Sequence, residues 1–419
     1  MSGLEQRLAG KSMVIVHVQT RMLTGGAEEN TWGSCLHQVK SGHVVHLICG
    51  RDSNIDYYRA RNSAVQVHLL PELVRHVSIK DDFAAYKKLT NLFEDLDADI
   101  VHTHTSKAGI LGRLAARRAG VPAIVHGVHI LPFSNVGFGE KVTYLLAEHA
   151  VAPLTDHFIH VSHGTHQAYR DARVGMRRPH SIVRSGMEVD RFPNASWPDD
   201  WREITGTNEG SEKPKVILML AALEARKRHD EFIRAFAALT RPGENIRLLL
   251  AGNGPEAANV AALVKSLNVA DRVRLLGHRS DPERLIALAD ICTLASLREG
   301  LPRVIVQSMG GGRPAVVSYV PGIEEIVTDQ VTGVIVRDSS AFAVAKECVA
   351  VVRNQQRLSA FTAAANEISI SEWSFKSMFE QLDAAYAETF ASPTVRGRML
   401  AKDGATHATQ ASIAVFADT

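Results

Sequence analysis

The sequence has few of the features that mark secreted, membrane-spanning or nucleic-acid-binding proteins. Its four cysteines lie far apart without paired spacing, which favours free thiols in a reducing compartment. No apolar run reaches the length of a membrane span, and the first ten residues contain no signal-peptide core. The net charge of +2 predicts no nucleic-acid partner. We therefore expect a cytoplasmic protein, with peripheral contact at the inner face of a membrane left open.

Several catalytic signatures are also missing. There is no Walker-type phosphate loop and no Gly-x-Ser-x-Gly elbow, which argues against a P-loop NTPase or a serine hydrolase. The segment Gly252-Asn253-Gly254-Pro255 lacks the third glycine of a dinucleotide fingerprint, so a dehydrogenase is disfavoured. The histidines at 102–104, 126–129 and 160–166 lack the Cys or Glu of a defined zinc motif. We expect structural histidines, no metal and no cofactor.

The 419 residues are too many for one ordinary core, and short β-branched runs alternate with amphipathic stretches in two series. This alternation predicts an α/β protein with parallel sheets and helices on both faces, in two doubly wound Rossmann-like domains facing across a cleft. We expect an N-terminal Rossmann-like domain at 1–193, a C-terminal Rossmann-like domain at 194–370, a closing helix at 371–390 that returns to the first domain, and a disordered tail at 391–419.

Twelve strands are predicted from these runs. In the first series they are Val14–Val18, Val44–Cys49, Val65–Leu70, Ile100–His104, Ala123–His126, Phe158–Ser162 and Ser181–Arg184. In the second they are Val216–Leu220, Arg247–Ala251, Val273–Leu276, Ile291–Ala295 and Ala315–Ser318. In parallel sheets of this kind, ligands bind at the carboxyl ends of the strands.

The most informative segment runs from Ser296 to Gly312 and contains Glu299-Gly300-Leu301-Pro302. It predicts a strand end, a polar turn and a helix that opens at Pro302, because proline is favoured at the first helical position. Unpaired N–H groups at such a helix start suit a phosphate, whereas an acidic residue beside a phosphate site suits sugar hydroxyls. Glu299 therefore suggests a nucleotide that carries a sugar.

Two further segments follow predicted strands. Arg226-Lys227-Arg228-His229 precedes a helix at the same end of the sheet as Glu299, where its cations could neutralise a diphosphate leaving group. Gly25-Gly26 precedes a helix in the first series and would let the backbone approach a ligand. A solvated basic loop and a plain tight turn are the simpler alternatives.

Taken together, these segments resemble the retaining GT-B glycosyltransferases that carry a Glu-x7-Glu motif (group 1, family 4). The likeness runs from about Val14 to Phe379 with the motifs in the family's order. The matching segments are Gly25–Glu28, Val101–Gly109, Ile124–Phe133, Arg184–Glu188, Val273–Asp281, the segment around Glu299 and Pro321–Gly333.

The resemblance implies transfer of a sugar from a nucleoside-diphosphate sugar with retention of configuration and usually without a metal. It gives His129, Lys227 and Glu299 catalytic positions: His129 touches the donor sugar, Lys227 faces the diphosphate and Glu299 holds sugar hydroxyls. Donor-binding positions implied by the family motifs or by their neighbourhood are Gly25, Gly26, Arg226, Lys227, Asn253, Gly254, His278, Glu299, Gly300, Leu301, Pro302 and Gln307.

The sequence departs from the family at two points. Ala221-Ala222 replaces the usual Gly-Arg pair, so one diphosphate arginine is absent, although Arg226 could supply charge. Gln307 replaces the second Glu, so ribose hydroxyls lose a charge-assisted acceptor. Neither change removes a proton donor or a nucleophile, so weakened activity is the expectation.

We expect a transferase that uses a UDP-sugar rather than a GDP-sugar and acts on a glycan or lipid-linked acceptor in surface polysaccharide biosynthesis. A nucleotide-sugar epimerase of the same fold and a non-catalytic nucleotide-sugar-binding protein are the alternatives. The basic, apolar stretches Leu73–Lys88 and Leu111–Arg118 could meet a lipid-linked acceptor, although solvated amphipathic helices are the simpler interpretation.

Overall fold

The computed structural model describes residues 12–23, 25–338 and 340–404, and these divide into two compact units. Unit 1 comprises the described residues up to Val161, residues 165–186 and the described residues from Met378 onward. Unit 2 comprises Ser162–Gly164 and Met187–Ser377. The chain thus leaves unit 1, builds unit 2 and returns.

A seven-stranded sheet forms the centre of unit 1. Its spatial order is β3-β2-β1-β4-β5-β6-β7, and every neighbouring pair is parallel. The strands are β1 (Val14–Gln19), β2 (Val44–Gly50), β3 (Val65–Leu70), β4 (Ile100–His104), β5 (Ala123–Val128), β6 (His157–His160) and β7 (His180–Ile182). The strand order reverses between β1 and β4, which makes this pair the switch point of the sheet.

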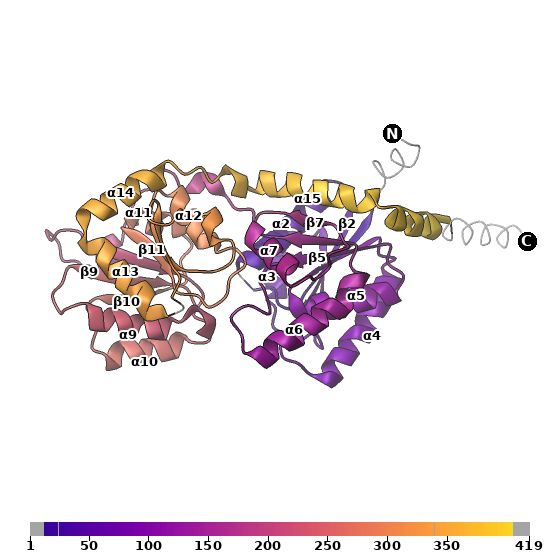
Figure 1. Cartoon of the computed structure of the whole chain (residues 1–419), viewed down its shortest axis with the longest axis horizontal. Coiled ribbons are helices and arrows are strands. Elements are labelled where there is room, and N and C mark those ends of the chain that lie inside the picture. The colour runs from indigo at the N-terminus through magenta and orange to yellow at the C-terminus, as the bar shows by residue number, and fades with distance from the viewer. Residues whose placement is uncertain (1–11, 24, 339, 405–419) are drawn as a thin grey trace, which may run out of the picture. The chain divides into compact units, whose positions relative to one another are not determined.

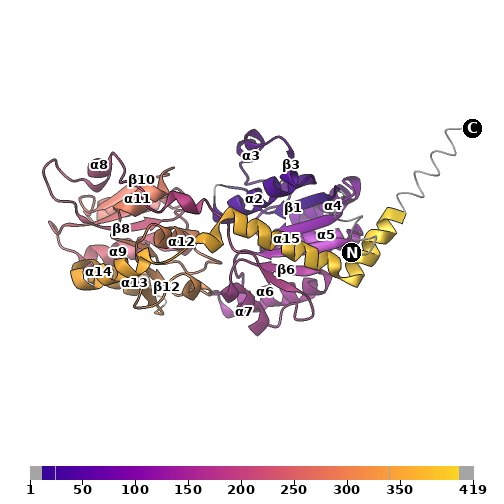
Figure 2. The ribbon, with the colours of Figure 1, turned by 90° about the horizontal axis from the view of Figure 1, so that it is seen from above.

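Helices cover both faces of this sheet (Figures 1 and 2). One face carries α4 (Ile79–Asp95), α5 (Ser106–Arg118) and α6 (Phe138–Val151), and the other carries α2 (Gly26–Lys40) and α15 (Phe375–Ala391). The remaining elements are α3 (Ile55–Arg61), the 3-10 turn η1 (Ala152–Leu154) and α7 (His163–Asp171). Because both faces are covered, β1, β4 and β5 are almost wholly buried, including the histidines that each of them carries.

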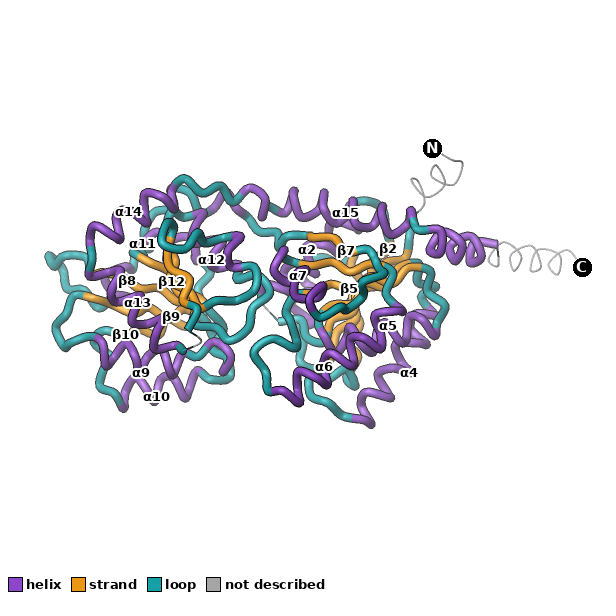
Figure 3. Tube along the Cα trace, viewed as in Figure 1, coloured by secondary structure: helices purple, strands orange, loops and turns teal. Residues whose placement is uncertain are grey.

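Unit 2 repeats the plan with six parallel strands in the order β10-β9-β8-β11-β12-β13 (Figure 3). They are β8 (Lys215–Leu220), β9 (Ile246–Ala251), β10 (Val273–Gly277), β11 (Ile291–Leu294), β12 (Ala315–Ser318) and β13 (Gly333–Val336). The α-helices are α8 (Trp201–Thr205), α9 (His229–Leu239), α10 (Ala257–Ser266), α11 (Pro282–Leu288), α12 (Arg303–Gly310), α13 (Ala341–Arg353) and α14 (Gln355–Asn366). The 3-10 turns are η2 (Val189–Arg191), η3 (Ala225–Lys227), η4 (Ile323–Glu325) and η5 (Ser371–Trp373). Here the order reverses between β8 and β11.

The α/β class and the two parallel-sheet Rossmann-like domains are confirmed, with strand ends within a few residues of the predictions. Strand β13 was not predicted, because its four residues follow a turn that we assigned only to a family signature. We predicted a domain boundary after residue 193, and the chain passes from unit 1 to unit 2 between Gly186 and Met187.

The predicted disordered tail needs correction. Residues 393–404 are helical and follow α15 after a break at Ser392, whereas residues 405–419 lie outside the described part of the chain. Lys402 pairs with Asp99 at 2.7 Å, and Arg398 donates to the carbonyl of Pro122 at 2.7 Å. These contacts attach the helical part of the tail to unit 1.

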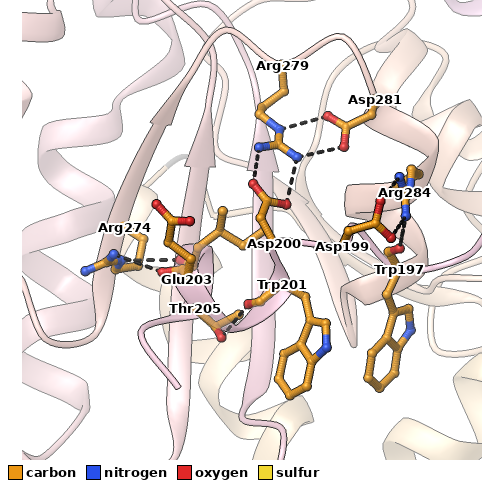
Figure 4. A network of polar contacts seen from close by, with 11 residues as sticks. Trp197, Asp199, Asp200, Trp201, Glu203, Thr205, Arg274, Arg279, Asp281 and Arg284 are labelled. Carbon is orange, nitrogen blue, oxygen red and sulfur yellow. Dashed lines mark hydrogen bonds and ion pairs between the residues drawn. The ribbon is translucent and has the colours of Figure 1, made fainter. Parts of the chain in front are cut away.

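The start of unit 2 is fastened by arginines (Figure 4). Arg279 binds the carboxylates of Asp200 at 2.7 Å and Asp281 at 2.7 Å, which holds α8 beside the end of β10. Arg284 likewise binds Asp199 and the carbonyl of Trp197. The polar segment 194–213 is thus part of unit 2.

None of the helices described in the structure is both long and apolar enough to cross a membrane. The longest, α4 and α15, have 17 residues each and carry charged side chains along their length.

A buried ion pair in unit 1 gives a stability prediction. Arg113 and Glu148 are 0% and 1% exposed and join α5 to α6 through a 2.8 Å contact between Nη2 and Oε2. We expect Arg113→Met to lower the free energy of unfolding by about 3–5 kcal/mol, because Glu148 is left as an unpaired buried charge. Urea unfolding of Arg113→Met, Glu148→Leu and the double variant tests this. The double variant should lose less than the sum of the single losses, and strict additivity would contradict the pairing.

Candidate active site

The predicted diphosphate and sugar residues meet at the switch point of unit 2. Lys227 follows β8 and Glu299 follows β11, and these two strands are neighbours in the sheet. Because parallel strands end at the same edge, both side chains stand at the carboxyl edge, where doubly wound sheets bind ligands. Lys227 donates a short hydrogen bond to Glu299 Oε1.

Arg226 completes this ion cluster. Its Nη1 lies 3.3 Å from Glu299 Oε2 and donates to the carbonyl of Arg298 at 3.2 Å, while its Nε lies 2.8 Å from Glu224 Oε2. The Arg226 carbonyl in turn accepts from the Leu297 N–H at 2.9 Å. The loops after β8 and β11 are thus joined by both backbone and side-chain contacts.

Charge balance within the cluster keeps Glu299 ionised. Burial acts to raise the pKa of the Glu299 carboxyl, but Lys227 and Arg226 together outweigh it, so the pKa lies below its ordinary value. Burial lowers the pKa of Lys227, and the carboxylate of Glu299 opposes that shift. Lys227 and Glu299 are each only 10% exposed. The result is a desolvated pair with a neighbouring arginine, whose electrostatic interactions are stronger than they would be in water.

The backbone after Glu299 enters α12 as expected, with one correction. The helix begins at Arg303, and Pro302 is its N-cap residue with φ −76° and ψ 91°, so proline stands one residue before the predicted first helical position. Gly300, Leu301 and Pro302 are buried. Pro302 still suits this place because it has no N–H to leave without a partner.

Other predicted donor-binding residues lie at the same edge of unit 2. Asn253 and Gly254 follow β9, and the half-buried Gln307 lies on α12. His278, which is exposed, follows β10. A Cβ at Gly254 would come within 2.4 Å of the Leu223 carbonyl oxygen, so packing alone requires glycine at this position, whether or not a ligand binds there. Their roles in donor binding stay predictions.

The predicted residues of unit 1 lie at the carboxyl edge of its own sheet. Gly25 is the N-cap of α2 after β1, Gly26 is the first residue of that helix, and His129 follows β5. Burial lowers the pKa of His129 to about 4, so its imidazole is neutral at neutral pH. His129 Nε2 lies 2.8 Å from His104 Nδ1.

Sequence reasoning missed several residues of these sites. Glu224 was not predicted, although it holds Arg226; a Glu two residues before an Arg is too common to serve as a signal. His17, His104 and Gln38 were treated as structural or not considered, yet they connect to His129. Only the pairing of β1, β4 and β5 brings them together.

Three buried histidines, His17, His102 and His104, offer ring nitrogens within 4.8 Å of one another and are the candidate metal ligands among the described residues. The direction of the nitrogens does not fit a metal. His17 Nδ1 and His104 Nε2 are 2.9 Å apart, the ring centroids are 5.2 Å apart and the ring planes differ by only 9°. With only 2.9 Å between the two nitrogens, the ring centroids can be 5.2 Å apart only if each nitrogen points at the other, as in a hydrogen bond. Ligand nitrogens would instead point at a shared third position.

Comparison with known proteins agrees with the fold. Residues 25–186 match a glycosyl transferase 4-like domain, and residues 201–368 match the glycosyl transferases group 1 domain. The chain is 27% identical over 328 residues to the Escherichia coli UDP-Gal:alpha-D-GlcNAc-diphosphoundecaprenol alpha-1,3-galactosyltransferase, covering 77% of this chain and 83% of the relative. It is 29% identical over 276 residues to the putative glycosyltransferase EpsD of Bacillus subtilis, covering 62% and 70%.

Among solved structures, Anabaena Alr3699/HepE in complex with UDP and glucose superimposes with a TM-score of 0.72 at 18% identity, over 90% of this chain and 100% of that chain. This likeness concerns the fold. With the two domain matches, one for each series of strands and helices, it identifies the protein as a glycosyltransferase of the GT-B fold that belongs to the group 1 glycosyltransferases.

Proposed function

We propose that the protein moves a sugar from a nucleoside-diphosphate sugar, preferably a UDP-sugar, to a glycan or lipid-linked acceptor in surface polysaccharide biosynthesis, with retention of anomeric configuration and without a metal. The observation that carries the proposal is the cluster of Lys227, Arg226 and Glu299 at the switch point of unit 2. The Escherichia coli relative is named for a UDP-sugar donor and a lipid-diphosphate acceptor, which supports both choices.

The cluster matches the charge changes of such a reaction. A departing diphosphate gains negative charge, so fixed cations stabilise the transition state more than the ground state. Lys227 and Arg226 supply these cations, and the diphosphate competes with Glu299 for them. Once released from the cations, the Glu299 carboxylate accepts hydrogen bonds from sugar hydroxyls. The resemblance assigns neutral His129 to the donor sugar near the reacting carbon, where an added positive charge would oppose an oxocarbenium-like centre.

The contacts of the carboxylates in the cluster support a route that needs no enzyme nucleophile. Glu224 is a second carboxylate, but Arg226 Nε binds it at 2.8 Å, so it is neutralised rather than poised for attack. We therefore favour departure and attack on the same face of the sugar, with the leaving phosphate accepting the acceptor's proton. Attack by an enzyme carboxylate would require Glu224 to leave its arginine.

The donor is identified by a thermal-shift screen of the protein against UDP, GDP, ADP and their common sugar conjugates, first without and then with a divalent metal. A bound nucleotide raises the melting temperature by mass action. A selective shift with UDP compounds supports the proposed donor. A shift that requires the metal contradicts the proposal that no metal is needed. Incubation of the donor without an acceptor tests the epimerase alternative, which is favoured if the product is an epimer of the donor rather than free sugar.

Substitutions in the ion cluster should reduce transfer strongly. We expect Lys227→Ala and Glu299→Ala each to lower kcat/KM by at least about tenfold, the loss of one charge-assisted contact in the transition state. Arg353→Ala is the matched control, because Arg353 pairs with Glu244 at 2.7 Å at the opposite end of the unit 2 strands. Full activity in Glu299→Ala would exclude the donor-site assignment. A loss in Glu224→Gln deeper than that in Glu299→Ala would instead indicate a covalent carboxylate.

Gln307 gives a prediction of increased affinity. Restoring the family's acid with Gln307→Glu should tighten UDP-sugar binding by about threefold to tenfold, because a carboxylate accepts hydroxyl hydrogen bonds about twice as strongly as an amide. Calorimetric titration of the wild type, Gln307→Glu and Gln307→Leu measures this. Equal affinities in all three would show that position 307 does not contact the nucleotide.

Unit 1 carries an apolar surface suited to a lipid-linked acceptor. On α4 and in the loop before it, Val77, Ile79 and Phe83 are 87%, 88% and 58% exposed, and on α6 Phe138 and Leu146 are 85% and 65% exposed. Exposed basic residues accompany them, namely Arg75, Lys80, Lys87 and Lys141. Contiguous exposed apolar patches mark protein or membrane interaction sites, and the basic residues suit an anionic headgroup layer.

Removal of this apolar surface should reduce membrane binding. We expect the double variant Ile79→Ser/Phe138→Ser to bind vesicles of phosphatidylglycerol and phosphatidylcholine at least about tenfold more weakly, since two large side chains no longer enter the bilayer. Phe342→Ser, which removes a 51% exposed side chain of unit 2, is the control in the same co-sedimentation assay. Unchanged binding in the double variant would restrict the acceptor proposal to water-soluble glycans.

A further inference from the structure

Four polar side chains of unit 1 form a continuous chain of hydrogen bonds that ends at His129. Gln38 Oε1 lies 2.7 Å from His17 Nε2, His17 Nδ1 lies 2.9 Å from His104 Nε2, and His104 Nδ1 lies 2.8 Å from His129 Nε2. The histidines come from β1, the end of β4 and the residue after β5, three neighbouring strands. In both histidine pairs the bonded nitrogens point at each other. The ring centroids of His104 and His129 are 5.1 Å apart and those of His17 and His104 are 5.2 Å apart, which is as far as such short nitrogen–nitrogen contacts allow.

The donors and acceptors along these hydrogen bonds are fixed by Gln38, the first of the four side chains. An amide oxygen accepts hydrogen bonds but cannot donate them, so His17 must carry its proton on Nε2. A neutral His17 then accepts at Nδ1, which places the His104 proton on Nε2. By the same step, His104 accepts at Nδ1 and the His129 proton lies on Nε2. The Nδ1 atom of His129 is left with a lone pair, and no described residue donates a hydrogen bond to it.

Tyr386 of α15 sets the orientation of the Gln38 amide. Gln38 Nε2 donates to Tyr386 Oη at 3.2 Å, which turns the amide oxygen toward His17. Tyr386 Oη lies 2.9 Å from His102 Nδ1 and can donate its own proton there. Hydrogen bonds at both its oxygen and its nitrogen therefore fix the orientation of the Gln38 amide.

Burial keeps the members neutral, as this logic requires. The pKa values of His17 and His129 are lowered to about 4 by burial, and burial also lowers that of His104 well below its ordinary range. A neutral imidazole has one donor and one acceptor nitrogen, so fixing one nitrogen fixes the other.

Gly127 makes room for the chain. A Cβ at this position would lie 3.0 Å from His104 Nδ1 and 3.2 Å from His129 Nε2. Any side chain there would press on the last link, which accounts for glycine inside a buried strand.

We propose that Gln38 is a positioning residue that fixes the tautomer of His129 through His17 and His104, so that His129 presents an unprotonated Nδ1 as a hydrogen-bond acceptor. This inference rests on the proposed function only where it assigns a use to that nitrogen: accepting a hydrogen bond from a hydroxyl of the donor sugar. Gln38 lies on α2 and is bonded to His17 rather than to His129. The effect travels through two histidines, so the tautomer is decided three side chains away from the atom that uses it.

The tautomer can be measured without any activity. Long-range proton–nitrogen correlation spectra of the full chain labelled with ¹⁵N-histidine distinguish protonated from bare ring nitrogens, and the signals absent in His129→Asn identify His129. We expect a bare Nδ1 and a protonated Nε2 in the wild type. A protonated Nδ1, or averaged signals from a mixture of tautomers, would overturn the proposal.

Two variants at position 38 test the origin of the effect. Gln38→Leu removes the acceptor at similar size and should average the two His129 nitrogen signals, whereas Gln38→Glu keeps an acceptor facing His17 and should retain the wild-type pattern. An unchanged His129 spectrum in Gln38→Leu would refute the role of Gln38. If Gln38→Leu fails to fold, the wild-type and Gln38→Glu spectra still decide, because loss of the bare Nδ1 in Gln38→Glu contradicts the proposal.

Kinetics separate this inference from the proposed function. We expect kcat/KM for sugar transfer to fall about tenfold in Gln38→Leu, the loss of one well-placed hydrogen bond, and to stay within about twofold in Gln38→Glu. A spectrum that changes as expected together with unaltered transfer would leave the tautomer assignment standing. It would exclude the contact between His129 and the donor sugar.

Discussion

The electrostatic balance around Glu299 is the interaction on which the candidate site depends. A carboxylate that is only 10% exposed is costly unless opposite charges compensate it, and two cations of the β8 loop do so. The same contacts join the loops after β8 and β11, so the shape of the carboxyl edge and its charge are set together. A ligand that brings its own negative charge meets cations already in place, and a ligand with hydroxyls meets their counter-ion.

The fold was predictable because its strands are buried on both faces. Continuous apolar runs such as that of β8 stand out from the amphipathic helices between them, and their alternation allows few topologies. Prediction failed where the signal was short or local. Strand β13 begins at Gly333, a residue that we had assigned only to the end of a family motif. The exact start of α12 depends on backbone angles at Pro302 that the residue type alone leaves open. The helix at 393–404 was missed because we took the whole of 391–419 as one small and polar tail, although Val395 and Met399 are buried at helical spacing.

The candidate site was predictable only in part. Lys227 and Glu299 could be found because each follows a strand in a segment of unusual composition, so their meeting at one edge follows from parallel topology. Partners that depend on register could not be found in this way. Gln38 and His17 are 21 residues apart, and Tyr386 lies 348 residues beyond Gln38. Nothing in the spacing of such distant residues shows that one buried network contains them all.

The return of α15 to unit 1 has a consequence for biosynthesis. His37 and Gln38 near the start of the chain contact Asp383 and Tyr386 near its end, whereas unit 2 is complete within residues 162–377. During translation, the chain of unit 2 is therefore synthesised before the C-terminal helices of unit 1. Until then, α2 covers its face of the unit 1 sheet without α15, and the contacts of Tyr386 with Gln38 and His102 form only when nearly the whole protein has been synthesised.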